Sequence, residues 1–478
     1  MTNAAHLYKI GRLEDAAQIC AVILEEQHEN FDALHLLGVI RWTQGRLQEA
    51  LNLQETALAA KPESYGANTY IGVILAGLGR FEEAIHSYCR ALAIKPDYAE
   101  VHNNLGTQLY VLKRYEEAIA SYHNALKIRP DFAEAHNNLG IVLAALGCYK
   151  EAIASYNNAL SIKPDYADAH RNKGFASLAM GDFDTGWPEY EWRWGTAHGL
   201  SEKRSFTQPL WLGMEDIAGK TILLHGEQGL GDTIQFARYL PLVASMGGTV
   251  ILEVQTGLKA LLGKLMGAEA VFERGERLPS FDVHCPLMSL PLAFKTRHAT
   301  IPANIPYILP DLARQTEWES RLRRREHPRI GIAWSGNPKH KQDHNRSIPL
   351  QKLTPLIREI RFNFYILQKE IRPADFELLK SSTLLINLSD QLNDFADTAA
   401  LVSLMDLVIS VDTSLVHLAG AMGKPTWILL AFSADWRWLL NRQDSPWYPS
   451  VRLFRQPKAC DWESVIESVS LECKKLFL

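Results

Sequence analysis

A 34-residue period runs through the first third of the chain and constrains its fold more than any other feature. Glycine, two sets of alanines and proline each recur in register: Gly38, Gly72, Gly106, Gly140 and Gly174; Ala50, Ala84, Ala118 and Ala152; Ala57, Ala91, Ala125 and Ala159; Pro62, Pro96, Pro130 and Pro164. Small residues suit the points where paired helices cross closely, and a proline cannot extend the helix that it follows. The period therefore predicts an α-solenoid of helical hairpins.

This period and these residue types resemble the tetratricopeptide repeat. Four full repeats are expected from Phe31 to Tyr166. Gly11 to Ala16 matches Gly45 to Ala50, so a truncated repeat is expected to begin the chain, and another begins at Ala167 and leaves the pattern near Gly186. We therefore predict a repeat solenoid over residues 1–186.

Three asparagines, Asn104, Asn138 and Asn172, occupy the same place on successive first helices of the repeats. If first helices line a concave face, these amides would form a ladder that bonds the N–H and C=O groups of an extended protein or peptide partner. The pattern resembles the asparagine ladder of O-linked N-acetylglucosamine transferases, which also join such repeats to a glycosyltransferase. The alternative is a common repeat residue that faces solvent, and Leu36 and Tyr70 replace it in earlier repeats.

Aromatic residues mark the end of the array, because 11 of the 12 tryptophans lie from Trp187 onward. Trp187, Tyr190 and Trp194 stand at helical spacing and are expected to close the array against the next domain. The segment Asp182-Phe183-Asp184 has the DxD form used by metal-dependent sugar transferases. Because it falls at the place of an inter-helix turn, we interpret it as turn chemistry and not as a metal site.

From Lys220 the pattern changes to alternating strands and helices. Strands are predicted at residues 221–225, 249–254, 270–273, 281–286, 330–334, 364–368, 384–388, 407–411 and 426–431, and helices at 234–243, 257–266 and 462–475. Prolines at 302, 306 and 310 mark a connection. Two Rossmann-like halves, residues 187–310 and 311–478, suggest the GT-B glycosyltransferase architecture. The predicted fold class is therefore α + α/β.

Residues 407–425 are the most informative stretch of the second half. A buried strand ends in the polar turn Asp412-Thr413-Ser414, and a helical pattern follows until Gly423 and Pro425 stop it. The carboxyl end of a parallel strand, next to a helix start, is where open sheets bind anions such as phosphate.

Two motifs resemble signatures of the ADP-heptose lipopolysaccharide heptosyltransferases. They are GLGDTIQFARYLP, from Gly229 to Pro241, and SVDTSLVHLAGAMGKP, from Ser410 to Pro425, in which Ser414 stands where glycine is usual. The resemblance covers roughly Thr221 to the C-terminus. It implies a glycosyltransferase that moves a sugar from a nucleotide-sugar donor to a hydroxyl acceptor, inverts the anomeric configuration and needs neither a metal nor another cofactor.

In that family the C-terminal half holds the nucleotide. The resemblance assigns the diphosphate to the backbone N–H groups and hydroxyls of Thr413 and Ser414, beside Asp412 and His417. The alternatives are helix capping by Asp412 and Thr413 and a buried, hydrogen-bonded imidazole at His417.

A second polar loop follows the strand at 330–334 and is expected at the same sheet edge. It contains Ser335, Lys339 and Arg346, and Gln368 ends the next strand. A cation there can neutralise the diphosphate and stabilise the departing nucleotide. Arg346 matches best the basic position of the heptosyltransferases, and the alternative is an exposed cation on a polar loop.

Asp232 matches the proposed base of the family, which takes the proton from the acceptor hydroxyl. It lies in an acceptor loop with Gly229 and Gly231, and Glu227 and His225 are alternates. The alternative is that Asp232 only caps the following helix, where the helix dipole would make its carboxylate a weaker base.

The net charge and the lengths of the apolar stretches exclude some classes of binding partner. A net charge of −4 gives no field that favours nucleic acid, and no apolar stretch approaches membrane-spanning length. Without a signal-peptide pattern, and with six cysteines that form no CxxC pair, the chain is expected to be reduced and cytoplasmic. Trp436, Trp438 and Trp447 are expected to pin a long loop to the core.

Two other functions remain open from the sequence. One is a non-catalytic repeat scaffold whose α/β part binds a nucleotide sugar without turnover. The other is a transferase that acts on a glycan acceptor, with the repeats serving assembly.

Overall fold

The computed structural model describes residues 1–322, 324–340, 343–360 and 362–477. It divides into two compact units, Met1–Asn172 and Lys173–Leu478. The division falls inside helix α11 (Ala167–Ala179), whereas the repeat pattern of the sequence continues to residue 186.

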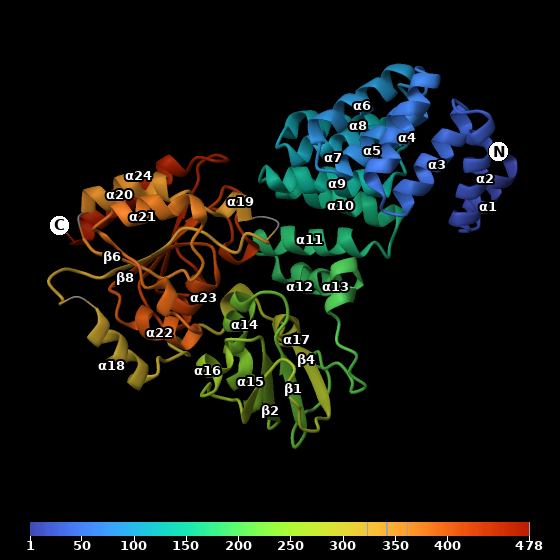
Figure 1. Ribbon diagram of the computed structural model, residues 1–478. Helices are drawn as coiled ribbons and strands as arrows, with labels where there is room; N and C mark the ends of the chain where they lie inside the picture. The colour runs from blue at the N-terminus through green and yellow to red at the C-terminus, as the bar shows by residue number, and fades with distance from the viewer. Residues whose placement is uncertain (323, 341–342, 361, 478) are drawn as a thin grey trace. The chain divides into compact units, whose positions relative to one another are not determined.

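The first unit consists of antiparallel helical hairpins (Figure 1). Its helices before α11 are α1 (Thr2–Lys9), α2 (Leu13–Glu26), α3 (Phe31–Thr43), α4 (Leu47–Ala60), α5 (Tyr65–Gly77), α6 (Phe81–Ile94), α7 (Ala99–Val111), α8 (Tyr115–Ile128), α9 (Ala133–Ala145) and α10 (Tyr149–Ile162). The first hairpin, α1 and α2, has a first helix of 8 residues where the next hairpin has 13, in agreement with the truncated repeat that the sequence predicts.

The repeated glycines lie where the two helices of a hairpin approach each other. A Cβ atom at Gly106 would fall 2.8 Å from the ring of Tyr122. A Cβ atom at Gly72 would be similarly close to the ring of Tyr88, and one at Gly140 to the ring of Tyr156. Real Cβ atoms essentially never come this close, so each of these helix crossings requires glycine.

The second unit begins with the end of the array and continues into two parallel sheets. Its helical elements are α12 (Phe183–Glu191), η1 (Trp192–Gly195), α13 (Ala197–Glu202), α14 (Leu230–Phe236), η2 (Ala237–Tyr239), α15 (Leu240–Ser245), α16 (Lys259–Leu262), η3 (Leu287–Ser289), α17 (Leu290–Ala293), η4 (His298–Thr300), α18 (Leu312–Arg321), α19 (Asp343–Arg346), α20 (Leu350–Ile360), η5 (Pro373–Asp375), α21 (Phe376–Ser381), η6 (Ser389–Gln391), α22 (Phe395–Ser403), α23 (Ser414–Ala421), η7 (Trp436–Trp438) and α24 (Trp462–Phe477).

The first sheet has four parallel strands in the order β3-β2-β1-β4. They are β1 (Thr221–His225), β2 (Thr249–Val254), β3 (Ala270–Glu273) and β4 (Val283–Pro286). Strand order reverses at β1, so its carboxyl end, where the glycine-rich loop begins, lies at a topological switch point.

The second sheet has six parallel strands in the order β10-β9-β8-β5-β6-β7. They are β5 (Ile330–Ala333), β6 (Phe364–Ile366), β7 (Leu385–Ile386), β8 (Leu407–Val411), β9 (Thr426–Leu430) and β10 (Val451–Arg455). Counted from β5, this is the doubly wound order 3-2-1-4-5-6 of dinucleotide-binding folds, with its switch point between β5 and β8. The structure therefore confirms the predicted α + α/β fold with two Rossmann-like halves.

The structure differs from the sequence prediction in local detail. The helix expected over residues 257–266 is only the short α16, Lys259–Leu262. The helix expected over residues 234–243 is divided into α14, η2 and α15, and Pro241 stands near the start of α15. The edge strand β10 was not predicted, because its sequence, VRLFR, carries arginines at Arg452 and Arg455 that weaken the apolar signal.

Aromatic side chains pack α12 against the long loop after β9. Trp436, Trp438 and Trp447 are buried, which confirms their interpretation as anchors. Trp187 of α12 packs edge-on against Trp436, with ring centroids 5.2 Å apart, and its indole N–H donates to the Thr296 carbonyl at 2.8 Å. Asp182 accepts from the Thr185 N–H at 3.2 Å at the start of α12, and this cap agrees with the interpretation of the segment as turn chemistry.

None of the helices in the described part of the chain combines the length and the apolar character that crossing a bilayer requires.

Candidate functional site

The two sequence signatures meet at the switch points of the two sheets. Helices α14 and α23, which carry them, lie side by side (Figure 1). A Cβ atom at Gly231 would fall 2.8 Å from Cδ2 of His417 and 3.2 Å from Cα of Ser414. Only glycine at position 231 allows this approach, so the loop after β1 and the start of α23 form one site.

The start of α23 is not capped by its own turn. Thr413 is the N-cap residue and makes no side-chain capping bond. The Asp412 carboxylate instead accepts from the indole N–H of Trp438 at 2.8 Å. Burial and the neighbouring Asp435 raise the pKa of Asp412 to about 6. The structure therefore contradicts the capping interpretation of these residues and leaves the helix start available to an anion.

His417 is a buried, hydrogen-bonded imidazole, the alternative that the sequence left open. Its Nδ1 lies 3.1 Å from the Tyr448 hydroxyl, and its ring stacks on Trp438 with centroids 5.5 Å apart. Burial, with the charges of Arg437 and Arg238, lowers its pKa well below 6.5. A neutral imidazole in this place packs α23 against Gly231.

Arg346 reaches the same helix start from α19. Its Nη1 donates to the Asp412 carbonyl at 3.0 Å, and its guanidinium lies over Gly336, where a Cβ atom would come within 2.6 Å of it. The guanidinium is therefore next to the turn that precedes α23. Lys339 is exposed on a turn, where its backbone N–H donates to Asn337 Oδ1 at 2.9 Å.

Gln368 is fully occupied in shaping the loop after β5. Its Oε1 accepts from the N–H groups of Trp334 and Ser335 at 2.8 and 3.2 Å, and its Nε2 donates to Ser335 Oγ and to the Glu370 carbonyl. Gln368 and Ser335 therefore position the loop that faces Arg346, and both are buried.

Asp232 lies between a backbone cap and an arginine of the other half. Its Oδ2 accepts from the Gly229 N–H at 2.8 Å, and its Oδ1 forms an ion pair with Arg437. Burial raises the pKa of the Asp232 carboxyl, against the opposing effect of Arg437 and of the Gly229 N–H. The predicted cap exists, and a carboxylate with a raised pKa is also a better base than a solvated one.

The two alternate bases are enclosed. Both oxygens of Glu227 accept from Arg193, at 2.7 and 3.0 Å, and both side chains are about 4% exposed. His225 Nε2 lies 3.2 Å from His284 Nδ1, and burial lowers the pKa of His225 to about 3. This geometry favours Asp232 over both of them.

The asparagines of the repeats bond to one another rather than lie open. Asn138 Nδ2 donates to Asn103 Oδ1, and Asn172 Nδ2 donates to Asn137 Oδ1, each at 3.0 Å. The amides therefore link successive repeats, a role that neither interpretation of the sequence included. Asn104 is half-buried and makes no such bond among the described residues.

Sequence reasoning missed Arg437 and the second role of Trp438. They are adjacent on η7, where Arg437 bonds Asp232 of the first signature and Trp438 bonds Asp412 of the second. The one available signal was an arginine inside an aromatic run, Trp436 to Trp438, in which a buried charge needs a partner.

Comparison with known proteins finds family models in both parts of the chain. A family model described as TPR repeat matches residues 72–110, 106–147 and 142–181, and one described as tetratricopeptide repeat matches residues 31–64. A model described as glycosyltransferase family 9 (heptosyltransferase) matches residues 379–468. The last match contains the signature at Ser410–Pro425 and the loop that carries Arg437, but not the signature at Gly229–Pro241.

Protein FlbA of Caulobacter vibrioides is 28% identical over 314 residues, which are 60% of this chain and 51% of FlbA. The chain thus spans about half the length of this relative.

Solved structures with a similar fold include MamA (22% identity, 35% of this chain and 98% of MamA, TM-score 0.32) and YrrB (20%, 37% and 92%, TM-score 0.33). A thermophilic TPR protein of Thermus thermophilus, TTC0263, is 26% identical over 37% of this chain and 97% of its own, with a TM-score of 0.32. At these TM-scores the likeness adds nothing to the assignment of function. The chain carries tetratricopeptide repeats in its N-terminal region and a glycosyltransferase family 9 (heptosyltransferase) domain at its C-terminus.

Proposed function

We propose that this protein is a glycosyltransferase that moves a sugar from a nucleotide-sugar donor to an acceptor hydroxyl, with inversion and without a metal. The observation that carries the proposal is the contact of the two signatures at Gly231, Ser414 and His417. It brings a carboxylate of one Rossmann-like half to the uncapped helix start of the other, which is the arrangement that such a transfer needs.

The donor diphosphate binds at the start of α23. The N–H groups of Ser414 and its neighbours point out of the helix there, and the helix dipole favours an anion. Arg346, which donates to the Asp412 carbonyl beside this turn, supplies a positive charge for the departing nucleoside diphosphate. In this proposal the arginine and the helix start take the part that a metal plays in other transferases.

Asp232 acts as the base. The acceptor oxygen attacks the anomeric carbon from the face opposite the diphosphate, its proton passes to the Asp232 carboxylate, and the bond from the anomeric carbon to the phosphate oxygen breaks with its electrons on the leaving diphosphate. Arg437 forms an ion pair with Asp232. An incoming diphosphate offers Arg437 a second anion, which would loosen this pair.

The repeats recruit a protein or peptide acceptor or partner in this proposal. Support comes from the repeat type. The donor sugar and the nucleotide base are left to experiment.

A thermal-shift screen against ADP-, UDP-, GDP- and dTDP-sugars tests donor binding, because a ligand stabilises in proportion to the logarithm of its concentration over Kd. The donor that binds is then incubated with candidate acceptors and with water. Asp232→Asn should keep the thermal shift and lose transfer, whereas Arg346→Met should lose most of the shift. No shift with any donor would refute the proposed function.

The second candidate, a scaffold that binds a nucleotide sugar without turnover, is favoured by the ion pair that occupies Asp232. It predicts a thermal shift without hydrolysis or transfer, and a shift that Asp232→Asn does not change. Full transfer activity in Asp232→Asn would instead keep the enzyme and exclude Asp232 as its base.

A further inference from the structure

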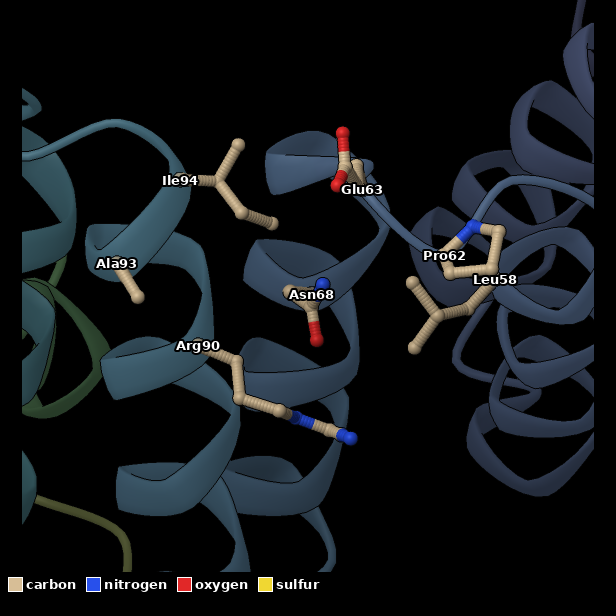
Figure 2. Close-up of a pocket in the computed structure, with 7 residues that line it drawn as sticks. All are labelled: Leu58, Pro62, Glu63, Asn68, Arg90, Ala93 and Ile94. Carbon is tan, nitrogen blue, oxygen red and sulfur yellow. The ribbon is translucent and has the colours of Figure 1, made fainter.

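A pocket of about 300 Å³ opens on the repeat unit between α4, α5 and α6. Figure 2 shows Asn68 of α5 between Leu58 and Pro62 on one side and Ala93 and Ile94 of α6 on the other. Leu58 is half-buried, and Ile94 is 40% exposed. The pocket therefore has a polar floor and apolar walls.

The floor carries a buried acceptor that lacks a donor. Asn68 is 2% exposed, and no donor among the described residues bonds its Oδ1. The amide nitrogen of the same side chain donates to the Ser64 carbonyl at 2.9 Å, which fixes the orientation of the amide. A buried acceptor without a donor is unfavourable, and a ligand that brings an N–H or O–H group would satisfy it.

The later repeats fill the equivalent space with a ring. The position of Asn68 is taken by His102, His136 and His170 at intervals of 34 residues. Each of these imidazoles donates through Nε2 to the carbonyl of the proline six residues before it, at 3.0, 3.0 and 2.8 Å. Asn68 is too short for this bond and turns to Ser64, so the space between residue 68 and Pro62 becomes the pocket.

We propose that this pocket binds a ring side chain with an N–H or O–H donor, an imidazole, indole or phenol, presented by a partner polypeptide. The ring takes the place that histidine fills in the next three repeats and packs against Leu58 and Ile94. Its donor hydrogen points to Asn68 Oδ1.

The rim indicates a polypeptide rather than a free ring compound. Arg90 and Glu63 are both exposed and stand on opposite sides of Asn68 (Figure 2). Their charges lie outside the apolar walls and suit the amide groups on either side of the bound residue. This site is separate from the asparagines that link the repeats and does not depend on the transferase chemistry.

The probes are 4-methylphenol and toluene, which have nearly the same shape but differ in the donor. Their dissociation constants are measured on the full-length protein by ligand-observed NMR titration. We expect 4-methylphenol to bind about fivefold more tightly or better, the factor that one hydrogen bond to a buried acceptor typically supplies. Equal affinities would overturn the role of Asn68 Oδ1.

Two variants follow from the repeats themselves. Asn68→His restores the residue of the later repeats, fills the pocket, and should weaken both probes more than tenfold. Asn68→Leu, which copies Leu34 of the first repeat, removes the acceptor and should abolish the preference for the phenol. If one variant fails to fold by circular dichroism, the other still decides the test. Unchanged preference in Asn68→Leu would refute the site.

The polypeptide part is tested with the blocked peptides acetyl-Gly-Tyr-Gly-amide and acetyl-Gly-Phe-Gly-amide. The tyrosine peptide should bind more tightly than both the phenylalanine peptide and 4-methylphenol, and Asn68→His should remove this difference. A tyrosine peptide that binds no better than the free phenol would show a site for small ring compounds and overturn the partner assignment.

Discussion

Replacement of Arg437 by methionine tests the link between the two halves. The guanidinium is 8% exposed and bonds Asp232, Asp435 and Gln235, with the Gln235 Oε1 contact at 2.6 Å. Methionine keeps the apolar stem of the side chain against Trp436 and leaves the Asp232 carboxylate without its cation. Breaking a buried pair in this way costs about 3–5 kcal/mol. Because Asp232 is 18% exposed and keeps the Gly229 N–H, we expect about 3 kcal/mol.

A double-mutant cycle separates the pair from the packing. Asp232→Asn alone should cost about 1 kcal/mol, since Arg437 keeps Asp435 as a partner. The double variant should cost less than the sum of the two single changes by roughly 1–2 kcal/mol, because a neutral amide needs no cation. Arg442→Met is the matched control in the same loop. Its partner Asp444 is 72% exposed, so we expect a loss of less than about 1 kcal/mol.

Tryptophan fluorescence reports the second unit, which holds 11 of the 12 tryptophans. Denaturant unfolding followed by this signal should show the loss, and the midpoint of thermal unfolding should fall by about 2 °C per kcal/mol. A loss below about 1 kcal/mol for Arg437→Met, or a coupling energy near zero, would refute the ion-pair argument.

The same variant carries a prediction for catalysis. Arg437 opposes the rise in the Asp232 pKa, so its removal should raise the pKa of that base further. The acid limb of the pH profile of kcat/KM should then move to higher pH in Arg437→Met. An unmoved acid limb would argue against Asp232 as the titrating base.

Three further changes test other parts of the structure. Gly231→Ala should destabilise the second unit by about 1–3 kcal/mol and weaken donor binding, because the new methyl group overlaps His417; a neutral effect in unfolding and thermal-shift assays would contradict the close approach. In His417→Gln, the free energy of unfolding should fall less between pH 7.5 and pH 5.5 than it does in the unaltered protein. Burial lowers the folded-state pKa, so the unfolded chain binds the proton more tightly, and stability present above pH 6.5 is lost as the pH falls below it. An equal slope in the two proteins would exclude this. Asn103→Ala should cost the repeat unit about 1 kcal/mol, whereas Asn104→Ala should cost close to nothing, and far-UV circular dichroism on denaturant titration would show whether the two differ.

The repeat unit could be predicted almost in full because its contacts are local. Gly72, Gly106 and Gly140 each meet a tyrosine ring 16 residues later in the same hairpin, and the next hairpin lies 34 residues on. A pattern of that length is visible in the sequence. The bonds between amides were missed because Asn103 and Asn138 are 35 residues apart, one more than the repeat period, so they do not occupy equivalent positions.

Strands with apolar, β-branched runs between turn residues were also determined locally, as at β1, β2, β3 and β8. The two signatures further indicated which strand ends carry the candidate site, because open parallel sheets bind ligands at the carboxyl ends of their strands. The sequence thus determined the fold class, the repeat array and the place of the candidate site.

Only the tertiary structure decided what the individual side chains do there. Asp232 and Arg437 are 205 residues apart, and their pairing depends on how the crossovers bring two sheets together. Gln368 became a loop anchor and His417 a packing residue because of partners on other elements. Side-chain roles depend on such distant partners, whereas periodicity reports only the element to which a residue belongs. A glycine at position 231 allows another element to pack closely against the backbone. Only the fold shows that this element is the start of α23, with His417 and Ser414.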